Sequence, residues 1–166
     1  MIGVFDSGIG GLTVVRALKG QLPQYDIVYF GDTARTPYGT KSPETVIQYA
    51  IEDAEILLEK GAELLVVACN SASSVATEAL REQFDVPILE VISPAVQMAV
   101  LAPKRTRVGV IGTRATVNSG VYKDKITALR PEMAVYGQPC PLLVPLVEEG
   151  WINKGETRKI VKKYLH

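Results

Sequence analysis

A cysteine stands at the point where an apolar run ends, and this position suggests proton transfer by a thiol. Residues 64–68 are apolar, and Cys69 follows them directly, ahead of Asn70 and Ser71. Such a run is typical of a strand covered on both faces of a parallel sheet, where ligands bind at the carboxyl ends of the strands. We expect a helix over residues 73–83, with Asn70, Ser71 and Ser73 as candidate N-cap residues, whose N-terminus favours the thiolate of Cys69. A buried, inert cysteine is the open alternative.

A carboxylate and a hydroxyl follow the first predicted strand. Residues 2–5 predict that strand, and Asp6, Ser7 and a glycine-rich turn lead from it into a helix ending near residue 21. The glycines do not fit G-x-G-x-x-G, and no G-K-[ST] follows, so dinucleotide and P-loop sites are disfavoured. A turn of backbone amides suits a carboxylate ligand, and Asp6 could orient a group or accept a proton. Alternatively, Asp6 only caps the helix.

A polar loop follows the second predicted strand, residues 26–30. Residues 31–41 include Tyr38 and Gly39, and the loop is long for a plain connection in a compact α/β domain. Loops of this kind are often functional, although a solvated turn is the alternative. Ser42 then predicts the cap of a helix reaching about residue 60, which we interpret as packing only.

The strand and helix pattern predicts an α/β fold. Strands alternate with helices up to about residue 92, and Ser93 with Pro94 predicts the cap of a helix ending near residue 101. Residues 107–113 then repeat the opening pattern, a strand containing glycine followed by a turn with a hydroxyl, and a helix over 118–129 follows them. We therefore expect two similar parallel-sheet lobes with helices on both faces, the second incomplete.

The lobes are expected at residues 1–92 and 93–166. The first would carry Asp6 and Cys69, and the second Thr116 and Glu148. The second lobe has sequence for only two or so strands, so it would be partial.

Composition excludes several kinds of protein. Lysine plus arginine equals aspartate plus glutamate at 18 each, so no basic field recruits nucleic acid or a membrane. Two cysteines, no signal peptide and no apolar run near membrane-spanning length favour a cytoplasmic protein without disulfides. The single histidine, His166, disfavours a histidine triad or a histidine-rich metal site. We expect no metal and no cofactor, since no lysine follows a strand end as a Schiff-base site would require.

The turns at three strand ends, taken together, resemble those of glutamate racemases in the aspartate/glutamate racemase family. The matching segments, in the family's order, are IGVFDSGIGGLT (2–13), GDTARTPYG (31–39), VACNSA (67–72), VGVIGTRAT (108–116) and CPLLVPLVEEG (140–150). The family more often has threonine at the position of Ser71. The resemblance covers essentially the whole chain.

The resemblance implies cofactor-independent interconversion of L- and D-glutamate, supplying D-glutamate for peptidoglycan. One thiolate would take the α-proton on one face while a second thiol delivers a proton to the other. Cys69 matches the first base, Asp6 its supporting acid, and Glu148 an acid that supports the second cysteine. The positions that match substrate-holding residues are Ser7, Tyr38, Gly39, Asn70, Ser71 and Thr116.

The family's second catalytic cysteine lies beyond residue 166, which leaves alternatives open. Cys140 is flanked by prolines and matches a noncatalytic position, so we do not expect it to replace that base. The chain could be a glutamate racemase with a truncated sequence, a relative that acts on aspartate, or a shortened protein that binds an acidic amino acid without racemising it. We expect glutamate as the small-molecule partner. We also expect a homo-oligomer, a dimer, because shortening would expose apolar surface.

Overall fold

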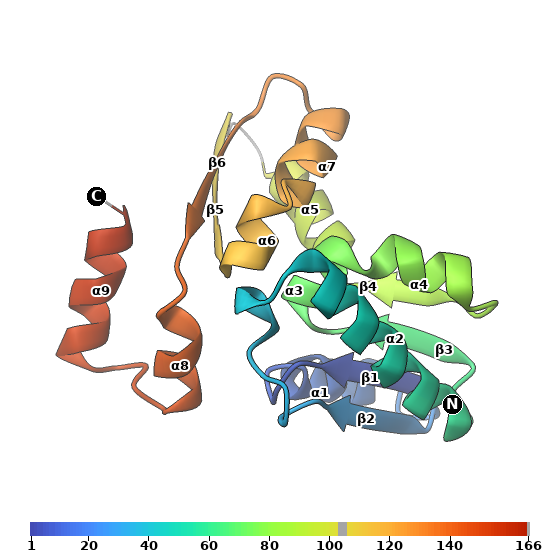
Figure 1. The fold of residues 1–166 in the computed structure, drawn as a ribbon. Coiled ribbons are helices and arrows are strands. Elements are labelled where there is room, and N and C mark those ends of the chain that lie inside the picture. Colours follow the sequence, from blue (N-terminus) through green and yellow to red (C-terminus); the bar gives the residue numbers. More distant parts are fainter. Residues whose placement is uncertain (103–105, 166) are drawn as a thin grey trace.

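The computed structural model describes residues 1–102 and 106–165 (Figure 1). His166 lies outside the described residues, as do residues 103–105. Within the described ranges, no helix combines the length and the apolar character needed to cross a membrane.

The first sheet has four parallel strands in the order β2-β1-β3-β4. They are β1 (Ile2–Asp6), β2 (Ile27–Gly31), β3 (Leu64–Val67) and β4 (Ile88–Glu90). Phe5 pairs in register with Phe30 on one side and Val67 on the other. The chain segments that follow β1, β2 and β3 therefore leave the sheet at the same edge.

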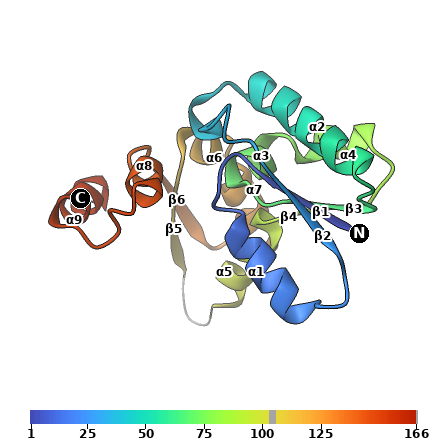
Figure 2. The same ribbon diagram turned by 90° about the horizontal axis from the view of Figure 1, so that it is seen from below.

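Helices cover both faces of this sheet, as Figure 2 shows. Helix α1 (Leu12–Gln21) packs on the face that carries Val4 and Val66. The other face carries Phe5 and Leu65, and the helices of that layer are α2 (Pro43–Glu59), α3 (Asn70–Val75) and α4 (Thr77–Gln83). Burial on both faces explains why β1 and β3 are apolar without alternation.

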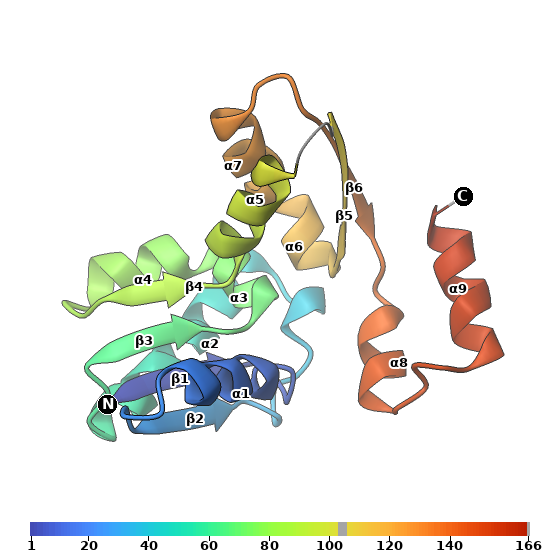
Figure 3. The same cartoon turned by 180° about the vertical axis from the view of Figure 1, so that it is seen from behind.

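The second sheet is formed by two parallel strands, β5 (Arg107–Gly112) and β6 (Ala134–Pro139). Its helices are α5 (Ile92–Leu101), α6 (Arg114–Asn118), α7 (Val121–Leu129), α8 (Leu143–Glu148) and α9 (Gly155–Leu165). In Figure 3, α5, α6 and α7 lie on one side of β5 and β6, and α8 and α9 lie on the other. The predicted α/β class, with parallel sheets and helices on both faces, is confirmed.

One predicted helix is divided in the structure, and another begins later than expected. The helix expected over 73–83 begins earlier, at Asn70, and is interrupted at Ala76, so it forms α3 and α4. The helix expected over 118–129 begins later, at Val121, as α7; the shorter α6 precedes it, and Gly120 lies between the two at φ +74°. Glycine adopts this left-handed conformation without a steric penalty, which allows the chain to change direction there.

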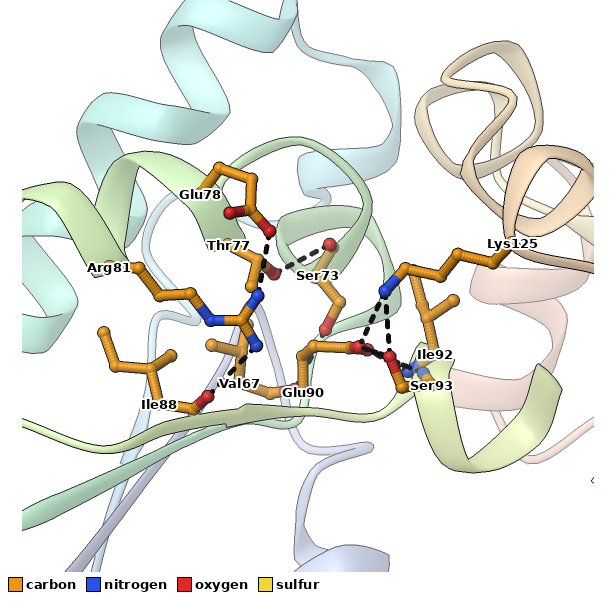
Figure 4. A network of polar contacts seen from close by, with 10 residues as sticks. All are labelled: Val67, Ser73, Thr77, Glu78, Arg81, Ile88, Glu90, Ile92, Ser93 and Lys125. Atoms are coloured by element: carbon orange, nitrogen blue, oxygen red, sulfur yellow. Dashed lines mark hydrogen bonds and ion pairs between the residues drawn. The ribbon is translucent and has the colours of Figure 1, made fainter. Parts of the chain in front are cut away.

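The N-terminus of α5 is capped by Glu90 rather than by Ser93, which corrects the expected cap (Figure 4). The Glu90 carboxylate accepts hydrogen bonds from the backbone N–H groups of Ile92 and Ser93. Lys125 Nζ of α7 lies 2.9 Å from Ser93 Oγ and 3.5 Å from Glu90 Oε1. This buried cap therefore links the end of β4 to two helices that pack on the second sheet.

Helix α5 begins at Ile92 and packs with the second sheet. Ile92 and Val96 share a core cluster with Ile126 of α7 and with Met133. This packing supports the proposed division into lobes 1–92 and 93–166, which stays a prediction.

Candidate active site

A cavity of about 360 Å³ lies at the carboxyl edge of the four-stranded sheet, beneath α8. The structure brings all but one of the predicted site residues to its lining. The predicted site residues that line the cavity are Asp6, Ser7, Tyr38, Gly39, Cys69, Asn70, Ser71 and Glu148. The remaining one, Thr116, is buried outside this lining. Apolar side chains of α8, among them Leu143 and Val147, form the wall that faces the strand ends.

Cys69 is the N-cap residue of α3 and is 4% exposed. Its Sγ accepts a hydrogen bond from the Ala72 N–H at 3.5 Å and lies 3.3 Å from Ser7 Oγ, to which the thiol donates. Asn70, Ser71 and Ser73 were expected to cap this helix, but the thiol occupies that place. Ser7 comes from the end of β1, so the two strand ends meet at the sulfur.

The pKa of the Cys69 thiol is raised, contrary to the expectation from its helix N-terminus. Burial is the main cause, and the Asp6 carboxylate adds to it, whereas hydrogen bonds with Ser7 and with the Ala72 N–H lower the pKa by less. Desolvation disfavours the thiolate more than one helix end favours it. In the free protein the thiol is therefore the prevailing form at neutral pH.

We expect the alkylation rate of Cys69 to keep increasing above pH 9 in the folded protein, because its pKa lies above the ordinary value of 9.0. Iodoacetamide labelling followed by peptide mass spectrometry at a series of pH values measures this. The same protein in urea serves as the control and should level off near the ordinary value. A folded-state profile that levels off below the urea profile would contradict the expected shift.

Asp6 shapes the turn that follows β1. Its Oδ2 accepts hydrogen bonds from the Gly8 N–H at 3.2 Å and from the Gly11 N–H at 3.1 Å. Gly11 is the N-cap residue of α1, so these bonds agree with the alternative in which Asp6 caps that helix. The same carboxylate raises the pKa of Cys69, which puts its charge within reach of the thiol. Asp6 can therefore order the turn and act electrostatically on the sulfur.

Tyr38 and Gly39 belong to a short 3-10 helix, η1 (Tyr38–Thr40), and both are buried. The Tyr38 hydroxyl lies 2.5 Å from Asp32 Oδ2 and 2.8 Å from Asp53 Oδ2. Because the hydroxyl is engaged there, contact between Tyr38 and a ligand would have to use its backbone. The contacts of Asp32 and Asp53 with Tyr38 were not predicted from the sequence. Asp32 lies in the polar loop that was expected to be functional, but Asp53 lies on a helix that was interpreted as packing only.

Thr113, the N-cap residue of α6, was also missed, although the turn containing it was noted for its hydroxyl. Its Oγ1 lies 3.0 Å from Ser71 Oγ and 3.1 Å from Thr116 Oγ1. Thr113 lines the cavity, and Thr116 contacts Thr113 without lining this cavity itself. Asn70 also reaches the second lobe, since its Oδ1 accepts a hydrogen bond from the Tyr122 hydroxyl at 2.8 Å.

Glu148 and Cys140 differ in their relation to the cavity. Glu148, at the end of α8, is exposed and lines it near Gly8, where an added β-carbon would lie 3.4 Å from Glu148 Oε1. Cys140 is buried and lines an adjoining cavity of about 300 Å³, and burial raises its pKa. Among the residues that the structure describes, Cys69 is the only thiol in the lining of the first cavity.

A thiol, hydroxyls and carboxylates at the carboxyl edge of a parallel sheet form an arrangement that can bind a small polar molecule and move a proton on it. The sequence profile of the Asp/Glu/Hydantoin racemase family matches residues 12–163, and the chain belongs to this family.

Similar proteins agree with this assignment. A glutamate racemase of Persephonella marina is 54% identical over 164 residues, which is 99% of this chain and 63% of that relative. The crystal structure of glutamate racemase from Francisella tularensis in complex with D-glutamate is 41% identical with a TM-score of 0.92, and the match covers 99% of this chain and 61% of that one. The glutamate racemase isoform RacE1 of Bacillus anthracis is 38% identical with a TM-score of 0.94, over 99% and 62% of the two chains. This chain thus spans about three fifths of the length of the relatives it matches.

Proposed function

We propose that this chain binds glutamate in the cavity at the sheet edge and is an isomerase that interconverts L- and D-glutamate by thiol chemistry without a cofactor. The observation that carries the proposal is the place of Cys69, a buried thiol between two strand ends in a cavity that also contains hydroxyl and carboxylate groups. The family and the D-glutamate complex of the similar Francisella tularensis enzyme support glutamate as the ligand. The product D-glutamate would serve peptidoglycan synthesis, and a cytoplasmic location stays a prediction.

In this proposal Cys69 transfers the α-proton. The Cys69 thiol first gives its proton to solvent. The Cα–H bond of glutamate then breaks as the S–H bond of the thiolate forms, and the electron pair left on the α-carbon delocalises into the adjoining carboxylate. Reverse transfer from the thiol restores an α-proton. The Ser7 hydroxyl, 3.3 Å from Sγ, and the Ala72 N–H can donate to the thiolate while it exists. Asp6 would serve proton transfer through its charge near the sulfur.

The substrate-holding roles follow from the lining. Backbone groups of Tyr38 and Gly39, with the side chains of Asn70 and Ser71, offer hydrogen bonds to the charged groups of an amino acid. Thr116 would act through Thr113, because Thr113 stands between it and the cavity. Glu148 would assist proton transfer on the side of α8.

A second candidate is binding with proton exchange but without inversion. It is favoured by one observation, that Cys69 is the sole thiol in the cavity lining within residues 1–102 and 106–165. Racemisation needs proton removal from one face and delivery to the other, and one thiol does not readily reach both.

Incubation with each enantiomer of glutamate in D₂O separates the two candidates. NMR detects α-deuterium and chiral chromatography detects inversion, while calorimetry measures binding. Exchange with inversion supports the racemase, and exchange without inversion supports the second candidate. Both candidate functions are wrong if calorimetry detects no glutamate binding.

We also expect the 166-residue chain to associate with itself, as a homo-oligomer. The exposed large apolar residues of the second lobe include Ile111, Tyr136, Val147, Trp151, Ile152 and Leu165. Exposed apolar surface of this kind commonly marks an interface. Sedimentation over a range of protein concentrations should show dimers, and Ile152→Glu should weaken them. Tyr25→Glu, at an exposed position in the first lobe, is the control and should leave them unchanged. A monomer at all concentrations would contradict the expectation.

A further inference from the structure

A partly buried polar cluster lies directly behind the Tyr38–Gly39 wall of the cavity. It consists of Asp32, Arg35 and Tyr38 from the loop after β2, and Glu52 and Asp53 from α2. The Arg35 guanidinium contacts all three carboxylates: Nε lies 2.5 Å from Asp32 Oδ2, Nη2 lies 2.9 Å from Asp53 Oδ1, and Nη1 bonds to Glu52. One positive charge thus faces three acids.

The Tyr38 hydroxyl has two carboxylate neighbours but only one proton. Asp32 Oδ2 lies 2.5 Å from it and Asp53 Oδ2 lies 2.8 Å from it. A phenol can donate to only one of these oxygens, and the second contact is favourable only if that carboxyl brings its own proton. Proton counting therefore requires one protonated acid in this trio.

Asp53 is the better placed of the two acids to hold this second proton. Its side chain is 0% exposed, whereas that of Asp32 is 5% exposed and has the shorter contact to Arg35. Burial, as the main cause, together with the charges of Asp32 and Glu52, raises the pKa of Asp53 to about 7, although Tyr38 and Arg35 lower it. The described groups that act on Asp53 are thus Asp32, Arg35, Tyr38 and Glu52.

We propose that Asp53 is a positioning residue for the ligand site, and that its protonated carboxyl donates to Tyr38, which donates to Asp32, so that this chain of hydrogen bonds fixes Tyr38 and Gly39 at the cavity. The functional part of this inference rests on glutamate being the ligand. Gly39 follows Tyr38 directly and packs against Thr113, so the chain of bonds also fixes the contact between the lobes. When Asp53 ionises, one hydrogen bond is replaced by a contact between two acceptors, and the 36–41 loop loosens.

The first test needs no ligand. Protein labelled with ¹³C at aspartate carboxyl groups is titrated by NMR, and we expect one carboxyl with a midpoint near pH 7 that is absent in Asp53→Asn. Glu55→Gln, an exposed change on the same helix, is the matched control and should retain it. The inference is wrong if every aspartate titrates near its ordinary value of about 3.9.

The second test measures the loop. Asparagine at position 53 keeps a donor for Tyr38 and an acceptor for Arg35 at any pH, so Asp53→Asn should hold the loop closed throughout. Amide hydrogen exchange of residues 36–41, corrected for the intrinsic pH dependence, should increase between about pH 6 and pH 8 in the wild type and not in Asp53→Asn. Tyr38→Phe keeps the ring but removes the hydroxyl, and should exchange rapidly at every pH. Equal profiles in all three proteins would overturn the positioning role.

The third test is glutamate affinity by calorimetry. If only the protonated form binds, affinity falls about eightfold from about pH 6.5 to pH 8 in the wild type, and stays constant in Asp53→Asn. A wild type that binds no glutamate at any pH refutes the proposed function, but the NMR and exchange results still decide the inference. A wild type that binds with the same pH dependence as Asp53→Asn refutes the inference alone.

Discussion

Replacing Cys69 with alanine is expected to reduce exchange of the α-proton of glutamate by about a hundredfold to ten-thousandfold, the usual contribution of a positioned acid or base. The physical reason is that the sulfur is the proton acceptor in this account and alanine has none. Cys69 is 4% exposed and sits in a cavity wall, so removal of one sulfur leaves a small void rather than a collapsed site. Glutamate affinity should therefore change much less than the exchange rate.

Cys140→Ala is the matched control, since this cysteine is similarly buried but lines the adjoining cavity. Exchange should continue in this variant at close to the wild-type rate. NMR in D₂O measures exchange in both variants, and calorimetry measures binding. Undiminished exchange in Cys69→Ala would contradict the proposed role of the thiol, and loss of inversion with exchange retained in Cys140→Ala would identify Cys140 as a second base.

The sheet could be predicted from the sequence because its strands are buried on both faces. Residues 2–5 and 64–68 are apolar without alternation, and each is followed by small polar residues, which marks both the strand and its end. Since parallel strands present their carboxyl ends at one edge, the sequence alone indicates that Asp6 and Cys69 meet there.

Properties that depend on tertiary packing could not be predicted in this way. The helix N-terminus beside Cys69 is a local feature and indicated a lowered pKa, but the burial that raises it comes from residues distant in sequence. The role of Asp53 was missed for the same reason, because a single aspartate on an amphipathic helix gives no sign of a buried tyrosine 15 positions earlier. The start of α7 after Gly120 was missed because one glycine inside a helical pattern is often tolerated.

Gly39→Ala is expected to disturb the site without removing any polar group. A β-carbon at position 39 would lie 2.3 Å from Thr113 Cβ and 2.4 Å from its Cγ2, far inside van der Waals contact. Thr113 cannot readily yield, since its Oγ1 accepts a hydrogen bond from the Thr116 N–H and lies 3.0 Å from Ser71 Oγ. Either the 3-10 helix leaves the cavity wall or the two lobes separate at this contact.

We therefore expect Gly39→Ala to lower the free energy of unfolding by about 1–3 kcal/mol, the usual effect of overpacking, and to weaken glutamate binding at least about tenfold. Gly109→Ala is the control, because a β-carbon on this strand glycine meets no atom within 4 Å among the described residues. It should be neutral or stabilising, since glycine in a strand interior is about 0.5–1 kcal/mol less favourable than alanine. Urea denaturation gives the stabilities and calorimetry the affinities. A clash of this size cannot be absorbed while Gly39 stays packed on Thr113. If Gly39→Ala and Gly109→Ala have the same stability and the same affinity for glutamate, the packing of Gly39 on Thr113 does not hold the site together.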